Sequence, residues 1–91
     1  MSNRSNIEQW LVAWFEKNSN VPKEAILNKI DANYFEEAWI DSFKFVSFIM
    51  EMEDSFNIKF SNDEFQDRGF STITGLTKII RKRLDDRDNK I

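Results

Sequence analysis

Apolar residues near the start of the chain recur at the spacing of one face of a helix. They are Ile7, Trp10, Leu11, Trp14 and Phe15. Because positions with this spacing fall on the same side of an α-helix, the pattern predicts an amphipathic helix over residues 6–18. Asn6 or Ser5 is suited to cap its start. The helix is expected to end before Val21-Pro22, because proline cannot continue it.

The stretch from Pro22 to Asp41 shows no sustained period. Short apolar clusters alternate there with asparagine and acidic residues. We expect a long loop held in place by its own apolar side chains, in which residues 24–28 can form one helical turn. Connections of about 20 residues are uncommon in compact domains, so this segment is expected to carry a function or to contain further structure.

The segment 42–56 gives the strongest helical signal. Its apolar residues cover about 220° of the helix circumference, which is too wide for one buried stripe. One side, expected to be interior, consists of Phe45, Phe48, Ile49, Met52 and Phe56. The other side, with Glu53 near the seam, consists of Phe43, Val46 and Met50. Either the helix is central to a bundle and both sides are core, or the second side is exposed and binds a partner.

The last third of the chain predicts two further helices. Ile58-Lys59-Phe60 alternates like a strand but is too short to pair stably, so we interpret it as an extended connector. A short helix is expected at 62–67 after the N-cap residue Ser61. A last helix is expected at 72–84, in which Gly75 costs about 1 kcal/mol relative to alanine.

These elements together predict an all-α fold, a four-helix bundle with a long first loop and a short third helix. A chain of 91 residues can bury only one core, so a single domain is expected over residues 1–84. Residues 85–91 are almost all charged and are expected to form a frayed tail.

The composition excludes several kinds of chemistry. The chain contains no cysteine and no histidine, which excludes disulfides, thiolate nucleophiles, zinc fingers and His-dependent triads. No acidic loop of the EF-hand type occurs. We therefore expect no metal site and no catalytic residue. No segment reaches the run of about 20 apolar residues that a membrane helix needs, and the start lacks the order of a secretory signal. A cytoplasmic monomer without membrane insertion is expected.

Charge is distributed unevenly along the chain. The net charge is −3, but residues 33–67 contain nine acidic residues and two lysines, whereas residues 68–91 contain seven basic and three acidic residues. An anionic surface attracts basic partners and repels nucleic acid. The cationic run Arg81-Lys82-Arg83 complements the dipole at the end of a helix, and without interleaved aromatic residues it is too short for a nucleic-acid module. We expect no nucleic-acid partner.

The pair Asp41-Ser42 is the candidate for chemistry. Both residue types accept hydrogen bonds from backbone N–H groups at a helix start, so the pair can be no more than a cap. The same position offers unpaired N–H groups and the positive end of the helix dipole. These would favour a phosphodiester on the Ser42 hydroxyl, with Lys44 one turn away. Capping and modification are compatible interpretations.

An ordered set of short motifs runs from residue 35 to residue 73. It comprises Phe35, Asp41-Ser42-Phe43, Glu53-Asp54-Ser55-Phe56, Ile58-Lys59-Phe60, Asn62-Asp63-Glu64 and Thr72-Ile73. In order and separation this set resembles the acyl carrier protein family, from about residue 34 to residue 80. The resemblance implies a four-helix fold and a phosphopantetheine group attached to Ser42, which carries acyl or aminoacyl groups as thioesters.

The resemblance also implies roles for neighbouring residues. Asp41 would contact the phosphopantetheinyl transferase or its Mg²⁺, and one side of the second helix would bind partner enzymes. The partner-binding residues implied are Phe43, Val46, Met50, Glu53 and Asp54. The partners implied are a phosphopantetheinyl transferase, an acyl- or aminoacyl-activating ligase, and a downstream acyltransferase or condensing enzyme.

Some positions depart from the family pattern. Trp39 replaces the glycine usual two residues before the aspartate, and we expect its ring to pack on the core. Lys44 and Ser47 stand where fatty-acid carriers are commonly acidic, which favours a specialised biosynthetic pathway. Phe45 and Phe48 would narrow a cargo cavity, a hypothesis that favours short or polar cargo. An unmodified helical interaction module and, less well supported, a small DNA-binding domain are the alternatives.

Overall fold

The computed structural model describes residues 3–88, and the side chains of residues 6–86. Its elements are α1 (Asn3–Ser19), α2 (Lys23–Asn28), α3 (Ser42–Phe56), α4 (Asn62–Gln66), the 3₁₀ helix η1 (Arg68–Ser71) and α5 (Ile73–Asp88). No strand occurs within this part of the chain. The predicted all-α fold is confirmed, and each of the four predicted helices is present.

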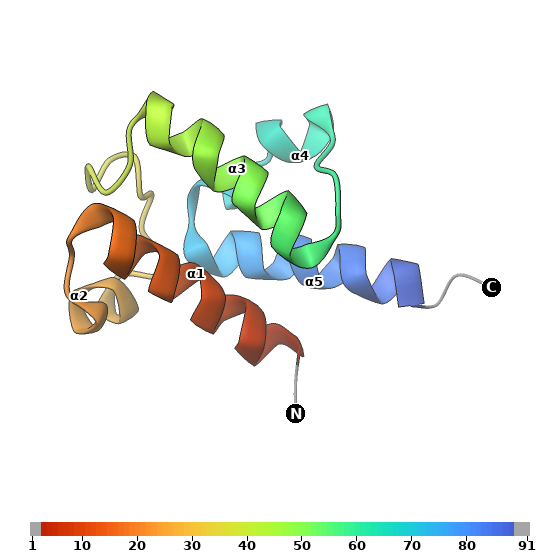
Figure 1. Cartoon of the computed structure of the whole chain (residues 1–91), viewed down its shortest axis with the longest axis horizontal. Coiled ribbons are helices and arrows are strands. Elements are labelled where there is room, and N and C mark those ends of the chain that lie inside the picture. The colour runs from red at the N-terminus through yellow and green to blue at the C-terminus, as the bar shows by residue number, and fades with distance from the viewer. Residues whose placement is uncertain (1–2, 89–91) are drawn as a thin grey trace.

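Three long helices, α1, α3 and α5, form the body of the molecule (Figure 1). Helices α1 and α3 run in opposite directions, so the end of α1 lies near the start of α3 (Figure 1). Helix α5 packs against α1 and against η1. Helix α4 has no buried residue. None of the helices between residues 3 and 88 is long and apolar enough to cross a lipid bilayer.

The core is rich in aromatic rings. The fully buried side chains include Phe15, Tyr34 and Phe48, which come from α1, the long loop and α3. In α3 the side expected to be interior is confirmed as such. Phe48 and Met52 are buried, and the other three members of that side pack against the core as partly buried residues. Because these contacts join segments far apart in the sequence, they fix α3 against α1 and the loop.

The segment between α1 and α3 contains the further structure that its length indicated. Helix α2 covers the predicted turn and buries Ile26. The rest of the segment is held by long-range hydrogen bonds: the Tyr34 N–H donates to the Ser71 oxygen over 3.0 Å, and the Thr74 N–H donates to the Ile30 oxygen over 3.0 Å. The buried Tyr34 hydroxyl donates to the Phe70 oxygen. These bonds fix the loop to η1 and α5.

Several of the predicted helix boundaries were wrong. Helix α1 begins at Asn3 and not at residue 6, so Ser5 and Asn6 lie within the helix and neither is its N-cap. The short helix expected at 62–67 ends at Gln66, because the Asp67 carboxylate accepts the Gly69 N–H over 2.7 Å and starts η1 instead. The last helix was expected to end at residue 84 but continues to Asp88, and an Arg81–Asp85 ion pair of 3.7 Å spans its last turns. Residues 89–91 of the expected tail lie outside the described part, and the domain boundary at residue 84 stays a prediction.

The presence of glycine at position 75 is explained by a packing contact that the sequence did not indicate. A Cβ atom at this position of α5 would lie 2.0 Å from the Gly69 oxygen. The close approach of η1 therefore requires glycine there, and this contact offsets the low helix propensity of glycine. Thr72 caps the same helix start, since its Oγ1 accepts the Gly75 N–H over 2.9 Å.

Candidate functional site

Ser42 is the first residue of α3 and is exposed, directly after a buried segment. Trp39 and Ile40 are only 8% and 6% exposed. As expected, the Trp39 ring packs on the core, with its centroid 5.8 Å from that of Phe15. The left-handed backbone conformation of this turn falls on Ala38 (φ 61°) and not on Trp39. The turn therefore accepts a large side chain where the family has glycine.

Asp41, not Ser42, caps the helix. Its Oδ1 accepts the Lys44 N–H over 2.8 Å, and its backbone is extended, as an N-cap requires. No hydrogen bond joins the Ser42 hydroxyl to another residue of the described chain. The cap function and the hydroxyl are thus separated on neighbouring residues, and the Ser42 oxygen is available for reaction.

Lys44 is not directed to Ser42. Its ammonium group donates to the main-chain oxygen of Asn18, at the end of α1. Residues two apart on a helix lie on different faces, so the structure does not bring Lys44 and Ser42 together. Lys44 instead ties the start of α3 to the end of α1, where a cation is favoured by the helix dipole.

The second apolar side of α3 is solvent-exposed. Phe43, Val46 and Met50 are 89%, 59% and 64% exposed, and we call them the apolar strip. The alternative in which these residues are core is therefore wrong. Together they place an apolar surface directly beside Ser42, which is the kind of patch that marks a protein interaction site.

The family model of the phosphopantetheine attachment site matches residues 9–80. The chain belongs to this family. No curated protein and no solved structure matches the chain significantly. The resemblance to acyl carrier proteins is confirmed by the match, and with it the cofactor: a carrier domain of this kind bears phosphopantetheine covalently on a serine. The match extends over most of α1, all of α2 to η1 and the first half of α5.

The start of α3 fits a phosphodiester. An exposed hydroxyl stands in the first helical turn, where backbone N–H groups lack intrahelical partners and the helix dipole is positive. Asp41 has one carboxylate oxygen engaged with the Lys44 N–H, and the structure shows no hydrogen bond to its Oδ2 from the described residues. Ser42 can therefore take the group without losing a contact that holds the fold.

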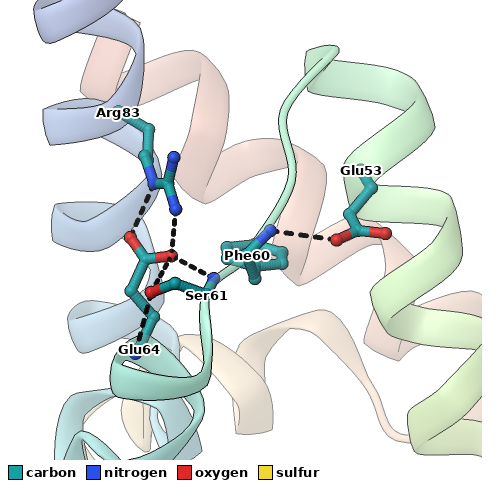
Figure 2. Close-up of polar contacts among 5 residues, drawn as sticks. All are labelled: Glu53, Phe60, Ser61, Glu64 and Arg83. Atoms are coloured by element: carbon teal, nitrogen blue, oxygen red, sulfur yellow. Dashed lines mark hydrogen bonds and ion pairs between the residues drawn. The ribbon is translucent and has the colours of Figure 1, made fainter.

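The two acidic residues predicted to bind partners differ in their surroundings. Glu53 is half-buried, and its Oε2 accepts the Phe60 N–H over 2.9 Å (Figure 2). It therefore holds the connector after α3. Asp54 is exposed. Both line a shallow depression at the end of α3 together with Met50, so one residue of the apolar strip adjoins the two acidic residues.

A polar cluster at α4 was missed by the sequence analysis. Glu64 accepts the Ser61 N–H over 2.8 Å, and its carboxylate accepts two hydrogen bonds from Arg83, over 2.7 and 2.8 Å (Figure 2). The hydrogen bond from Arg83 lowers the pKa of Glu64 and raises that of Arg83. The spacing of Ser61 and Glu64 is a capping box and could have been found, whereas nothing in the sequence indicates Arg83 as the partner.

Proposed function

We propose that this carrier domain bears phosphopantetheine on Ser42 and carries acyl or aminoacyl groups as thioesters to partner enzymes. The observation that supports this most is the free, exposed Ser42 hydroxyl at the start of α3, with Asp41 providing the cap. The cofactor supplies a terminal thiol, to which the cargo is bound. The domain supplies the tether and the surface by which enzymes recognise it.

In the attachment step the Ser42 oxygen forms a bond to the phosphorus on the pantetheine side of coenzyme A. The diphosphate bond breaks, adenosine 3′,5′-bisphosphate leaves, and the hydroxyl proton passes to a base of the transferase. We assign to Asp41 a contact with the transferase or its Mg²⁺ through the oxygen that the cap leaves free. The chain contains no histidine and no cysteine, and we propose no catalytic role for it.

The apolar strip is the proposed docking surface, with Asp54 and the outer side of Glu53 as its acidic edge. Its proposed partners are the transferase, an activating ligase, and an acyltransferase or condensing enzyme. Residues 42–50 contain one lysine and no acidic residue. A partner that depends on carboxylates in the two helical turns after the serine would find none, which supports a specialised pathway. Because attachment consumes coenzyme A, we place this activity in the cytoplasm.

The test is incubation with coenzyme A and a promiscuous phosphopantetheinyl transferase, followed by intact-mass measurement. The wild-type protein is expected to gain the mass of one phosphopantetheine group and Ser42→Ala to gain none. Ser47→Ala and Ser61→Ala are matched controls, because they remove an exposed serine within α3 and a serine at another helix start. Both are expected to be modified fully.

Modification of Ser42→Ala, or no modification of the wild type, would overturn the assignment. If the wild type is not modified, the exposed apolar strip remains to be explained. The alternative of an unmodified helical interaction module would then replace the proposed carrier function.

A further inference from the structure

The end of α1 is bonded to the chain on both sides of Ser42. Before it, the Ser19 hydroxyl donates a hydrogen bond to the main-chain oxygen of Trp39. After it, the Lys44 ammonium group donates to the main-chain oxygen of Asn18. We call these two hydrogen bonds the flanking bonds. They hold the end of α1 beside the start of α3 (Figure 1), and the residue proposed to bear the cofactor lies between them.

The flanking bond at Trp39 fixes the chain just before the helix. The N–H group of the same residue donates to the Tyr34 oxygen over 3.0 Å. Its ring packs on Phe15, and Ile40 is buried next to it. A residue held at its N–H, its ring and its oxygen has few alternative conformations, so the chain reaches Asp41 in one direction.

The flanking bond at Lys44 acts on the first turn of α3. The N–H groups of a first turn have no partner within the helix, so helix starts open more readily than helix centres. In α3 the Asp41 cap holds the Lys44 N–H, and the end of α1 holds the Lys44 ammonium group. Lys44 thus resists opening of this turn through its backbone and through its side chain.

Attachment depends on this turn because Ser42 and most of the apolar strip lie in different turns. Val46 and Met50 follow Ser42 by four and eight residues, about one and two turns along the helix. An enzyme that docks on the strip therefore finds the hydroxyl in place only while the first turn is formed. Transfer reactions tolerate little displacement of the reacting atom. Opening of the first turn would move the hydroxyl and leave Val46 and Met50 where they are.

We propose that Lys44 and Ser19 are positioning residues for the attachment of phosphopantetheine. Through the flanking bonds they keep the first turn of α3 closed and present the Ser42 hydroxyl in one place to the transferase. This inference depends on the proposed attachment at Ser42. It gives Lys44 a function other than a contact with the phosphodiester, and it includes a residue of α1, which lies outside the proposed docking surface.

The test measures transferase kinetics with coenzyme A at varied concentrations of the carrier domain. Lys44→Met keeps the aliphatic chain and removes the ammonium group, and Ser19→Ala removes the other donor. Each is expected to lower kcat about 3- to 10-fold, the effect of one hydrogen bond. KM is expected to stay nearly unchanged, because the apolar strip still docks. Lys44→Arg, which keeps a charged donor, is expected to restore most of the rate.

Two control variants separate positioning from charge and from general stability. Lys17→Met removes an exposed cation from the last turn of α1 and leaves both flanking bonds in place. Thr77→Ala removes a buried hydrogen bond to the Ile73 oxygen, of 2.8 Å, and so destabilises the fold within α5. Both variants are expected to keep the wild-type kcat and KM.

Amide hydrogen exchange follows the first turn of α3 without the transferase. The Phe45 N–H donates the first hydrogen bond of this helix, to the Asp41 oxygen over 2.9 Å. Its exchange is expected to be about 3- to 10-fold faster in Lys44→Met and in Ser19→Ala than in the wild type, because each variant loses one bond that keeps the turn closed. Lys17→Met is expected to exchange at the wild-type rate.

A wild-type kcat in Ser19→Ala would overturn the inference, because a transferase that contacts the Lys44 charge directly loses rate only in Lys44→Met. So would an equal loss of rate in Thr77→Ala, or Phe45 exchange that neither variant changes. Intact mass after the reaction separates the two levels. A wild-type protein that gains no group contradicts the attachment itself and with it this inference, whereas modification of both variants at the wild-type rate contradicts only the positioning.

Discussion

Helices α3 and α4 both begin with a serine and an acidic residue, but the two residue types exchange roles. At α3 the Asp41 carboxylate accepts the backbone N–H and Ser42 follows as the first helical residue. At α4 the Ser61 hydroxyl accepts the Glu64 N–H, and Glu64 completes the capping box. One serine is free and the other is part of the fold.

The difference between the two helix starts is a shift of one position. A serine at the N-cap uses its hydroxyl to satisfy a backbone N–H, and its replacement by alanine costs about 1 kcal/mol. A serine one residue later makes no such hydrogen bond, so its hydroxyl is not needed for the fold. The comparison therefore explains why Ser42, and not Ser61, is suited to carry a prosthetic group, although both stand where a helix dipole would favour a phosphate.

The largest expected effect comes from moving the serine onto the cap. In the double variant Asp41→Ser with Ser42→Ala, the new hydroxyl is expected to bond the backbone, as in α4, and attachment of phosphopantetheine is expected to be lost completely. The measurement is intact mass after incubation with coenzyme A and a promiscuous transferase. Asp41→Ser alone is the control, expected to be modified on Ser42 at a reduced rate. Full modification of the double variant would show that a serine at the N-cap can carry the group, and would contradict the explanation drawn from the two helix starts.

The next effect concerns the contact between α5 and η1, the 3₁₀ helix that follows α4. Gly75→Ala places a Cβ 2.0 Å from the Gly69 oxygen of η1, so the free energy of unfolding is expected to fall by about 1–3 kcal/mol through overpacking. This is opposite in sign to the gain of about 1 kcal/mol that helix propensity alone predicts. Urea unfolding measures the change. Gly69→Ala, whose Cβ meets nothing closer than 3.2 Å, is expected to cost less, and a stabilised Gly75→Ala would contradict the contact.

A smaller effect is expected from Glu64→Gln, which removes the ion pair with Arg83. At neutral pH the free energy of unfolding is expected to fall by about 1 kcal/mol. The effect is small because both side chains are partly exposed and solvent weakens the ion pair. The pKa of Glu64 is lower in the folded protein than its usual value of 4.5. The ionised Glu64 therefore contributes its full share to the free energy of unfolding above the usual pKa. This contribution is lost as the pH falls through the pKa of the folded protein.

Urea unfolding of the wild type and Glu64→Gln should accordingly differ at pH 7 and converge in acid. Asp63→Asn serves as control, because it removes an exposed acidic residue of the same helix that has no ion pair with a described residue. Its effect on stability is expected to stay below about 0.5 kcal/mol. A difference in the free energy of unfolding between wild type and Glu64→Gln that grows in acid would contradict the expected direction of the pH dependence.

The smallest effect on stability is expected from Met50→Glu. Because Met50 is 64% exposed, the free energy of unfolding should change by less than about 0.5 kcal/mol. The transferase kcat/KM is nevertheless expected to fall about 5- to 10-fold, since the charge interrupts the apolar strip. Ser55→Glu, at another exposed position of α3, should leave the rate unchanged. A loss of several kcal/mol in Met50→Glu would mark the position as structural.

Sequence reasoning was most successful where the information is local. The period of Phe45, Phe48 and Met52 predicted the interior side of α3, and the motif around Ser42 predicted the family that the match confirmed. It left open whether the apolar strip was core, because helical period alone does not tell which of two apolar sides meets another element. The assignment of Ser42 and of the docking residues stays a prediction.

What could not be predicted depends on residues far apart in the chain. Lys44 is paired with the Asn18 oxygen and Arg83 with Glu64, and no local pattern indicates either contact. The reason for Gly75 likewise lies in η1. Such pairings are determined by how the helices cross, so they required the structure.

The separation of cap and hydroxyl at Asp41-Ser42 also bears on how enzymes sense whether the domain is charged with cargo. If Ser42 bears the group as proposed, esterification breaks no hydrogen bond of the described fold, so the helices are expected to keep the same contacts in the bare, the primed and the loaded protein. An enzyme that distinguishes these forms is then expected to contact the prosthetic arm or its cargo.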